Sequence, residues 1–263
     1  MTGWGKGCHG GIERGVKGRM EYSLMTKLAA ECVGTAILMI FGNGAVADVD
    51  LEGTKGHHSG WLTIAMGYGF GVMFPVLMFG GVSGAHINPA MTLGQAVIGI
   101  FPWSLVLPYI VAQLVGAALG QLVVYACYFP HYRMTKDPLP ILGTFCTTDA
   151  SGSLVNYFIN EFFGTLVLVL GALCCLQGPW GSKGLAAASI VVGLIVWGLV
   201  TSLGGPTGPG LNPARDLVPR FLHWILPVPN KGDSRWGEAW IPVVAPIIGA
   251  IVGAVMFKVL FAA

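Results

Sequence analysis

Two copies of the tripeptide Asn-Pro-Ala carry the polar atoms whose types and spacing could do chemistry in this chain. The first lies in "GVSGAHINPAM" (81–91) and the second in "GPGLNPARD" (208–216), both in apolar surroundings. Asn is a favoured helix N-cap, and Pro suits the first helical position, where its missing N–H costs nothing. Each tripeptide therefore predicts a helix start, at Asn88, Pro89 and Ala90 and at Asn212, Pro213 and Ala214.

The two predicted helix starts would form a polar site if they met inside a membrane. Each helix N-terminus carries a positive partial charge of roughly half a unit, so two facing ends repel cations, including hydronium. The amides of Asn88 and Asn212 can donate hydrogen bonds to a hydroxyl or water oxygen. The carbonyls predicted to accept along one wall are those of Gly84, Ala85, His86, Gly208, Pro209 and Gly210.

The elements that must position these atoms are long apolar segments. The chain has 263 residues, of which 54% are hydrophobic and 10% charged, whereas soluble domains are about a quarter charged. Residues 56–132 contain no Asp, Glu, Lys or Arg, and a membrane span needs roughly 20 apolar residues. The sequence therefore predicts a multi-pass protein of the cell membrane. The six predicted spans are 24–47, 61–80, 103–128, 154–178, 185–204 and 239–261.

Two further apolar segments, 88–101 and 212–226, are too short to cross a bilayer and have the length of re-entrant helices. Non-helical backbone is predicted before them, over 81–87 and 205–211. At membrane depth, such backbone is tolerated only where protein buries it or where it lines a water-filled cavity.

The chain also repeats itself. "AECVGTAILMIFG" (30–42) is similar to "NEFFGTLVLVLGA" (160–172), which matches Glu31 with Glu161. Each half reads as span, span, short segment, span, and three spans per half make the second half enter the membrane from the opposite side. Short segments at corresponding positions of inverted halves are the best pointer to a transport site.

The predicted fold class is an all-α membrane protein with six transmembrane helices and two re-entrant half-helices in an inverted 3+3 repeat. A single channel domain is expected over 22–263, with one repeat at about 22–130 and the other at about 152–263. A disordered basic tail or an added extension is expected over 1–21.

Glycines spaced four apart mark two of the predicted spans. The pairs are Gly116 with Gly120 and Gly249 with Gly253, and small residues at this spacing let helices approach closely. The spacing leaves open whether the close helix lies in the same subunit or in a neighbouring one.

The basic residues favour cytoplasmic termini. Five lie before or at the first span: Lys6, Arg14, Lys17, Arg19 and Lys27. Basic residues are enriched in cytoplasmic segments. Loops predicted on the other side also carry Lys and Arg, so the bias is small.

The two signatures resemble those of the aquaporin, or major intrinsic protein, family. The matching stretches are S-G-A-H-x-N-P-A at 83–90, N-P-A-R-D at 212–216 and E-x-x-G-T in both halves. The resemblance covers the chain from about residue 22. It implies the aquaporin fold, a homotetramer in which each protomer has its own pore, membrane lipid as surroundings, and no cofactor.

Within that family the chain is similar to the glycerol facilitator branch. That branch carries Asp after N-P-A-R, here Asp216, a basic residue four positions on, here Arg220, and the pair Pro242-Val243 in the last span. A histidine typical of strict water channels is replaced by Val200. The resemblance implies passage of glycerol, related polyols and water, with ions and protons excluded.

The resemblance also implies a selectivity filter of Tyr68, Val200, Pro209 and Arg215. Tyr68 stands where glycerol channels usually have Trp, and Pro209 where they have Phe. These departures predict a less aromatic and wider opening. We therefore carry dihydroxyacetone, urea and protonated lactic acid as further candidate solutes.

Other polar residues within the apolar segments have predicted roles. A charge at membrane depth is functional by default, and the resemblance implies that Arg215 lies at the constriction. The symmetric placement of Glu31 and Glu161 suits buried acceptors, and the resemblance implies that they and Asp216 support the non-helical loops. We expect His86 to pack against its loop; Gln113 either bonds loop backbone or is a satisfied polar group of the helix bundle.

Alternative functions follow from the same features. A water-selective aquaporin would share the fold, and a secondary transporter would share inverted repeats and broken helices. An enzyme is disfavoured because the sequence lacks Ser-His-Asp, paired catalytic carboxylates and H-E-x-x-H. The net charge of +2 comes without a basic stripe, so no nucleic-acid partner is expected. The cysteine spacing predicts neither a metal site nor a disulfide framework.

Overall fold

The computed structural model describes residues 21–178, 183–208 and 210–261, and every regular element over these ranges is a helix. Of the predicted tail, only Glu21 lies among the described residues. In chain order the elements are α1 (Leu24–Asp50), α2 (Trp61–Phe79), α3 (Pro89–Val97), α4 (Trp103–Met134), α5 (Pro138–Gly143), α6 (Leu154–Leu176), α7 (Leu185–Thr207), α8 (Pro213–Ile225), the 3₁₀ turn η2 (Trp236–Glu238) and α9 (Ile241–Phe261).

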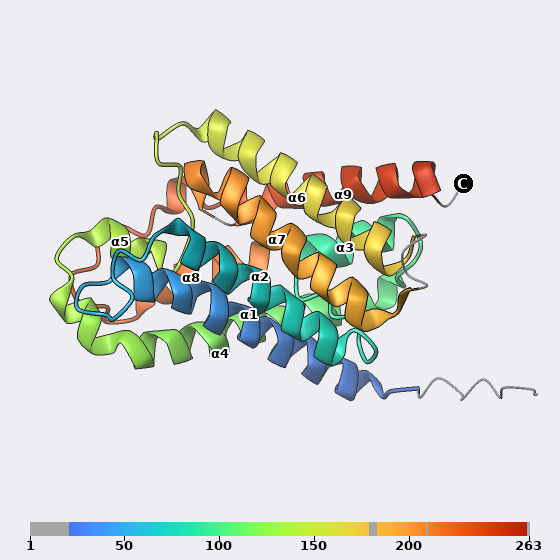
Figure 1. The fold of residues 1–263 in the computed structure, drawn as a ribbon, viewed down its shortest axis with the longest axis horizontal. Helices are drawn as coiled ribbons and strands as arrows, with labels where there is room; N and C mark the ends of the chain where they lie inside the picture. The colour runs from blue at the N-terminus through green and yellow to red at the C-terminus, as the bar shows by residue number, and fades with distance from the viewer. Residues whose placement is uncertain (1–20, 179–182, 209, 262–263) are drawn as a thin grey trace, which may run out of the picture.

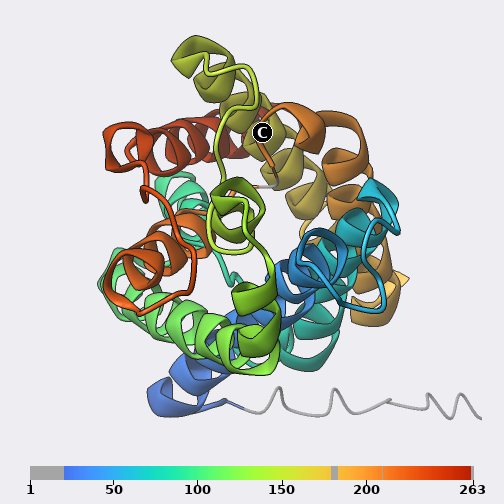
Figure 2. The ribbon, with the colours of Figure 1, turned by 90° about the vertical axis from the view of Figure 1, so that its left-hand side faces the viewer.

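Six of these helices, α1, α2, α4, α6, α7 and α9, are long and apolar enough to cross a membrane. The prediction of six spans and two short helices is confirmed. Figure 1 shows the six long helices running side by side, with α1 beginning and α9 ending at the same end of the bundle. Figure 2 looks along the bundle and shows α5 near the middle of the opposite end.

The two halves of the chain pack in corresponding ways. The most extensive helix contacts are α6 with α9, α1 with α4, α2 with α7, and α1 with α2. The short helices cross between halves, because α3 packs chiefly on α9 and α8 packs on α4. Each half therefore positions the re-entrant helix of the other, with α3 and α8 in opposite halves of the bundle's length (Figure 1).

The glycine pairs make close helix contacts within this one chain. A Cβ atom at Gly116 would overlap the carbonyl oxygen of Cys32, and one at Gly249 would overlap that of Phe162. Gly120 and Gly253 make equivalent approaches one turn further along. The glycine spacing thus serves contacts inside the subunit, α4 on α1 and α9 on α6.

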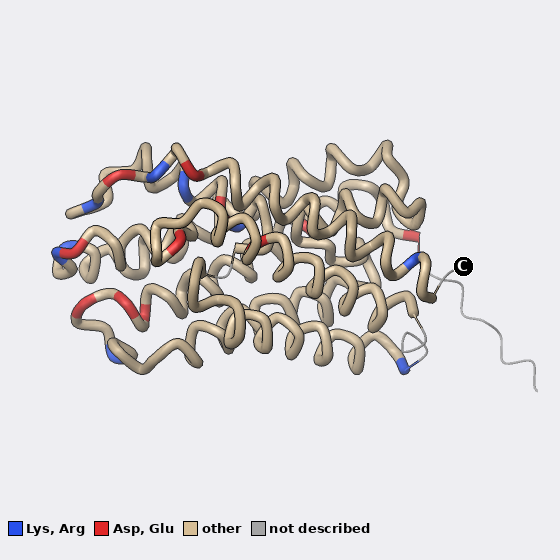
Figure 3. The backbone as a smooth tube through the Cα atoms, turned by 90° about the horizontal axis from the view of Figure 1, so that it is seen from above, with Lys and Arg blue, Asp and Glu red and all other residues tan. Residues whose placement is uncertain are grey.

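Charged side chains gather at the two ends of the bundle. Figure 3 shows long uncoloured stretches between them, interrupted by a few acidic and basic positions in the interior. The buried charged residues are Glu31, Glu161, Arg215, Asp216 and Arg220, together with Asp149 in a loop. Because buried charges are costly unless paired or hydrogen-bonded, these interior positions locate the site.

The structure corrects two predicted boundaries. The segment 205–211 was expected to be non-helical throughout, but α7 continues to Thr207 and ends at Gly208, whose φ of 84° suits glycine. Pro206 lies in the last turn, where it removes one backbone donor. At this end of α7 the Asn160 side chain of α6 donates to the carbonyl of Leu203 at 2.8 Å and to the hydroxyl of Thr207 at 2.6 Å.

The second corrected boundary is the end of the first short helix, which stops at Val97 although the apolar segment runs on to 101. Gly99, with a φ of 84°, turns the chain there. The helix α5 is a further difference. It begins after Asp137, whose carboxylate accepts from the backbone of Leu139 at 2.9 Å, and the sequence analysis did not assign it.

Candidate pore and constriction

The two short helices meet at their N-termini through a reciprocal pair of hydrogen bonds. The Asn88 amide nitrogen donates to the carbonyl oxygen of Leu211 at 2.8 Å, and that of Asn212 donates to Ile87 at 2.8 Å. Each Asn oxygen caps its own helix, accepting from the backbone of Ala90 at 2.9 Å and of Ala214 at 3.0 Å. One amide hydrogen of each Asn is therefore structural, and one remains for a ligand.

The loop before α3 has an unusual backbone conformation, with positive φ angles at two residues that are not glycine. Ala85 and Ile87 have φ values of 46° and 44°, a region that a β-branched residue rarely adopts. The carboxylate of Glu31 holds this conformation, because it accepts from the backbone of His86 at 2.9 Å and of Ile87 at 2.7 Å. It also accepts from the hydroxyl of Ser83 at 2.7 Å. Such strain costs about 1–3 kcal/mol per residue and persists only where surrounding groups enforce it.

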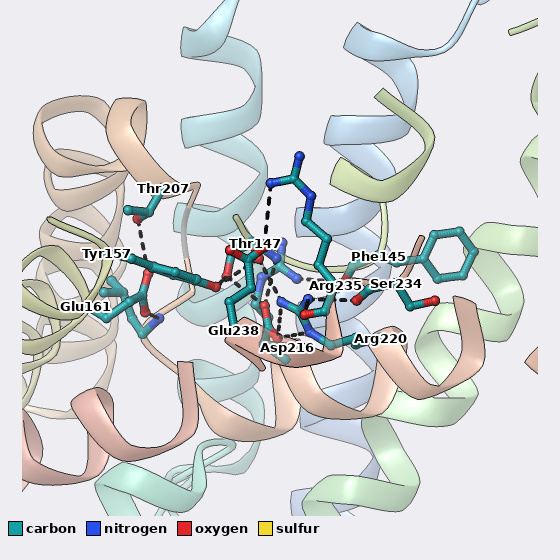
Figure 4. Close-up of polar contacts among 12 residues, drawn as sticks. Phe145, Thr147, Tyr157, Glu161, Thr207, Asp216, Arg220, Ser234, Arg235 and Glu238 are labelled. Carbon is teal, nitrogen blue, oxygen red and sulfur yellow. Dashed lines mark hydrogen bonds and ion pairs between the residues drawn. The ribbon is translucent and has the colours of Figure 1, made fainter. Parts of the chain in front are cut away.

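Glu161 plays the corresponding part in the other half. Its carboxylate accepts from the backbone of Leu211 at 2.6 Å and from the hydroxyl of Thr207 at 3.2 Å. Leu211 has a φ of 53°, so the strained residue again lies directly beside the carboxylate. Figure 4 shows Glu161 and Thr207 joined in this way.

A central cavity passes between the helices at the level of the two asparagines. Its polar lining comes from the loops and short helices: Gly84, Ala85, His86, Ile87, Asn88, Gln95, Gly210, Leu211, Asn212 and Arg215 contribute atoms there. Its apolar lining comes from four spans: Leu38, Val72, Val76, Leu168, Ala172, Leu176, Val192, Val196 and Val200, with Met91 of α3. The cavity can thus meet carbon on one set of surfaces and hydroxyl groups on another.

Arg215 lies where the central cavity meets a second one. This second cavity, which we call the mouth cavity, is lined by Val46, Asp50, Trp61, Leu139, Gly143, Cys146, Thr147, Thr148, Asp149, Ala150, Gly205, Pro206, Thr207, Gly208, Arg215 and Arg235. Arg215 lines both cavities and is 1% exposed. This shared position is the candidate constriction of the pore.

Tyr68 and Val200, two of the predicted filter residues, line the central cavity together with Arg215. The guanidinium of Arg215 donates to the hydroxyl of Tyr68 and lies 5.1 Å from the centre of its ring. A second donor of the guanidinium reaches the carbonyl oxygen of Phe145 at 2.9 Å. Trp61 approaches from the mouth cavity, where its indole N–H donates to the carbonyl oxygen of Val200 at 2.7 Å. The fourth predicted filter residue, Pro209, lies outside the described residues.

Asp216 supports a different loop from the one that precedes its helix. Its carboxylate accepts from the backbone and hydroxyl of Thr147 at 2.7 and 2.6 Å and pairs with Arg220 at 2.9 Å. Arg220 in turn donates to the carbonyls of Thr147 and Ser234, both within 3.0 Å. As Figure 4 shows, this buried pair ties α8 to the segment that also contains Phe145.

The mouth cavity is also lined by a carboxylate, that of Asp149, which stays ionised. Burial disfavours its charge, but hydrogen bonds from the side chains of Ser151 and Asn156 and from the backbone of Ser153 outweigh that cost. They hold the pKa of the Asp149 carboxyl below its ordinary value. The mouth cavity therefore has a fixed negative charge near neutral pH.

The remaining predicted residues divide between the two cavities. Gly84, Ala85, His86 and Gly210 line the central cavity, whereas Gly208 lines the mouth cavity instead. The carbonyl of Gly208 accepts from the backbone of Gly210 at 3.1 Å, so it serves the loop itself. The other two carbonyls facing the asparagines belong to Ile87 and Leu211, which the sequence analysis did not name.

His86 and Gln113 both support the first loop through side chains. The His86 ring packs edge-on against the ring of Phe101, with 4.6 Å between the ring centres. Its Nδ1 atom forms a hydrogen bond with the hydroxyl of Thr92 at 3.1 Å. The Gln113 amide donates to Glu31 at 2.9 Å and to Thr92 at 3.0 Å. The bonds recorded for Gln113 thus go to side chains of the bundle rather than to loop backbone.

Comparison with known proteins identifies the family to which the chain belongs. The family model described as major intrinsic protein matches residues 19–257. The chain belongs to the major intrinsic protein family. The resemblance predicted from the two Asn-Pro-Ala segments is thereby confirmed, and the six apolar spans make this family member a multi-pass membrane protein.

Relatives within the major intrinsic protein family cover most of the chain. Glycerol uptake facilitator protein-like 5 of Lactiplantibacillus plantarum is 51% identical over 232 residues, which cover 86% of this chain and 93% of that protein. A glycerol uptake facilitator protein of Streptococcus pneumoniae is 47% identical over 84% of this chain and 93% of its own. The structure of the aquaglyceroporin from Plasmodium falciparum matches with a TM-score of 0.81 at 32% identity, over 90% of this chain and 97% of that one.

Three polar residues of this family member were missed by the sequence analysis. Gln95 of α3 lines the central cavity, and Asn43 and Gln121 are fully buried within α1 and α4. Each is a polar side chain inside an apolar helix, which is a signal that the sequence does carry. Within the described residues, no cluster of three or more His, Cys, Asp or Glu gathers to hold a metal ion.

Proposed function

We propose that this chain is a passive transmembrane channel for glycerol, related polyols and water, and not an enzyme. The observation that carries the proposal is the double lining of the central cavity. Nine apolar side chains from four spans can contact the carbon atoms of a polyol, while Asn88, Asn212 and Arg215 can donate to its hydroxyl groups. The relatives named as glycerol uptake facilitators support the same solute.

Exclusion of ions follows from the same arrangement. The N-termini of α3 and α8 meet at the cavity, and Arg215 adds a positive charge at the constriction. Positive helix ends and an arginine together oppose cations and hydronium. This argument also disfavours a secondary transporter, which would need a cation or proton site near the same place.

The test is a stopped-flow light-scattering assay on proteoliposomes. We expect glycerol to cross much faster than in empty liposomes, with a rate that does not saturate at low concentration and needs no counter-ion. Val200→Trp is the matched control, because an indole at this cavity-lining position should block the passage while leaving a membrane-embedded protein. Fast water permeation with glycerol excluded would favour the water-selective alternative, and a counter-ion requirement would favour a transporter.

Wider solutes extend the proposal. Tyr68 and Val200 line the central cavity beside Arg215, and the presence of only one aromatic ring in this described group supports an opening that admits wider solutes. We include dihydroxyacetone, urea and protonated lactic acid as solutes. Lactate uptake should then rise as pH falls and track the neutral acid, whereas glycerol uptake should stay level.

The assembly and orientation are further parts of the proposal. We infer a homotetramer with one pore in each protomer, surrounded by membrane lipid, and termini on the cytoplasmic side. The many exposed apolar side chains on the outer faces of the spans support a protein or lipid covering. Cross-linking in membranes tests the tetramer, and protease accessibility of a tag on the C-terminus in sealed vesicles tests the orientation.

A further inference from the structure

A buried asparagine lies behind the constriction without lining either cavity. Asn43 sits in the C-terminal half of α1, two turns before its end, and is fully buried. Its amide oxygen accepts from the hydroxyl of Tyr68 at 2.5 Å, and Tyr68 lines the central cavity. A polar group so deep in an apolar span is costly unless its bonds are made, which raises the question of what these bonds do.

Two backbone carbonyls decide which way the Asn43 amide faces. The carbonyl of Thr144 accepts from the Gln121 amide nitrogen at 3.2 Å, which leaves the Gln121 oxygen to accept from Asn43 at 2.6 Å. The carbonyl of Phe145 also accepts from the Asn43 nitrogen, at 3.3 Å. Because a carbonyl can only accept, the Asn43 nitrogen must face these two groups and its oxygen must face Tyr68.

The direction of the next two bonds follows. The Tyr68 hydroxyl has one hydrogen, which it donates to Asn43, so its oxygen is left to accept from the guanidinium of Arg215. A second guanidinium donor of Arg215 reaches the carbonyl of Phe145 at 2.9 Å. Phe145 therefore closes a ring of hydrogen bonds that runs through Arg215, Tyr68 and Asn43.

We propose that Asn43 is a positioning residue for the constriction: through Tyr68 it holds the guanidinium of Arg215 in place and so sets the size limit for solutes. The inference rests on the proposed channel function and deepens it. The Tyr68 hydroxyl has no donor left for a solute, so Tyr68 acts on solutes through its ring and through the place it gives to Arg215.

A purely structural role for Asn43 makes a different prediction. Loss of a bundle hydrogen bond would lower the amount of folded channel and reduce every permeability in proportion. Loss of a positioning bond would change the ratio between two solutes of different width. The ratio of ribitol to glycerol permeability, measured at equal amounts of folded protein, separates the two roles.

The experiment compares five proteins in proteoliposomes: wild type, Asn43→Leu, Tyr68→Phe, the double variant, and Thr35→Val as the control. Thr35 lies on the same helix and is fully buried, and among the described residues its hydroxyl bonds only the Glu31 carbonyl of its own helix, at 2.7 Å. Asn43→Leu and Tyr68→Phe should each raise the ratio about fivefold, the effect expected for one lost hydrogen bond. The double variant should rise no further, and Thr35→Val should match wild type.

An unchanged ratio in Asn43→Leu would overturn the inference, as would a double variant in which the two single effects multiply. Should Asn43→Leu fail to fold, Gln121→Leu replaces it, because it removes the nearer of the two acceptors that orient the Asn43 amide. Tyr68→Phe is measured in either case. If it lowers glycerol permeability without changing the ribitol-to-glycerol ratio, the Tyr68 hydroxyl binds the solute directly and the inference is wrong. Failure of the channel proposal looks different, since wild type itself would then pass glycerol no faster than empty liposomes.

Discussion

The ring of Tyr68 packs directly on Gly42 of α1, so closely that a methyl group on Gly42 would overlap the ring. The same ring lines the central cavity and lies against the guanidinium of Arg215. The absence of a side chain at Gly42 therefore decides how far the ring recedes from the cavity. Gly42 shapes the constriction from behind.

Gly42→Ala is expected to push the Tyr68 ring toward the cavity. Overpacking of this kind costs about 1–3 kcal/mol, and a barrier raised by about 1.4 kcal/mol would lower glycerol permeability about tenfold. The control is Gly44→Ala on the same helix, where the nearest atom, Val124 Cγ2, lies 3.9 Å from the new methyl group. Equal permeability of both variants in proteoliposomes would contradict this account.

Glu31→Gln should destabilise the protein. The carboxylate oxygens face only donors, from His86, Ile87, Ser83 and Gln113, and the substitution turns one oxygen into a further donor. A buried donor left without an acceptor costs about 1–3 kcal/mol. The measurement is the thermal unfolding midpoint in detergent, followed by circular dichroism.

Glu161→Gln is expected to behave like Glu31→Gln, because the carboxylate there also accepts from loop backbone. Thr165→Val is a control for both, since the hydroxyl of Thr165 donates to the Glu161 carbonyl of its own helix at 2.8 Å and bonds nothing else in the part of the chain that the structure describes. If either Gln variant unfolds at the temperature of wild type, the carboxylates do not hold the loops.

Gly249→Ala should weaken the packing of α9 on α6. The added methyl group would overlap the carbonyl oxygen of Phe162, which is backbone and cannot rotate away. We expect a loss of about 1–3 kcal/mol, read as a lower unfolding midpoint. Gly198→Ala is the matched control, because nothing lies within 4 Å of its new methyl group. An equal midpoint for both variants would argue against the close helix approach.

Arg220→Met should be among the most destabilising single changes at this site. It leaves the fully buried carboxylate of Asp216 without its ion pair, and breaking a buried pair costs about 3–5 kcal/mol. Asp216→Leu combined with Arg220→Met should recover part of that loss, because no unpaired charge remains. A double variant less stable than both singles would show that the pair itself contributes net stability.

The spans and the caps could be predicted from local sequence. Apolar runs of sufficient length give α1, α2, α4, α6, α7 and α9, and Asn followed by Pro gives the starts of α3 and α8. The end of α7 could not be placed in this way. A proline at 206 predicts a break, but α7 runs through it to Thr207, where the Asn160 side chain of α6 bonds Leu203 and Thr207.

The site residues also fall into those that could be predicted from the sequence and those that could not. The types and symmetry of Glu31 and Glu161 and the charge of Arg215 at membrane depth were enough to single them out. Two features could not be predicted: that Gly208 lines the mouth cavity instead of the central one, and that Asn43 bonds the hydroxyl of Tyr68. Both depend on which groups are brought near by helices that lie far apart in the sequence.

By itself the sequence determined the elements and their inverted order, because span length and helix capping are set by residues within a few positions of one another. Tertiary structure decided what the polar groups bond to. Two of the groups that accept from the Arg215 guanidinium are the Phe145 carbonyl, 70 positions away along the chain, and the Tyr68 hydroxyl, 147 positions away. A guanidinium is oriented by acceptors within hydrogen-bonding distance, and only the packed bundle brings these acceptors to it.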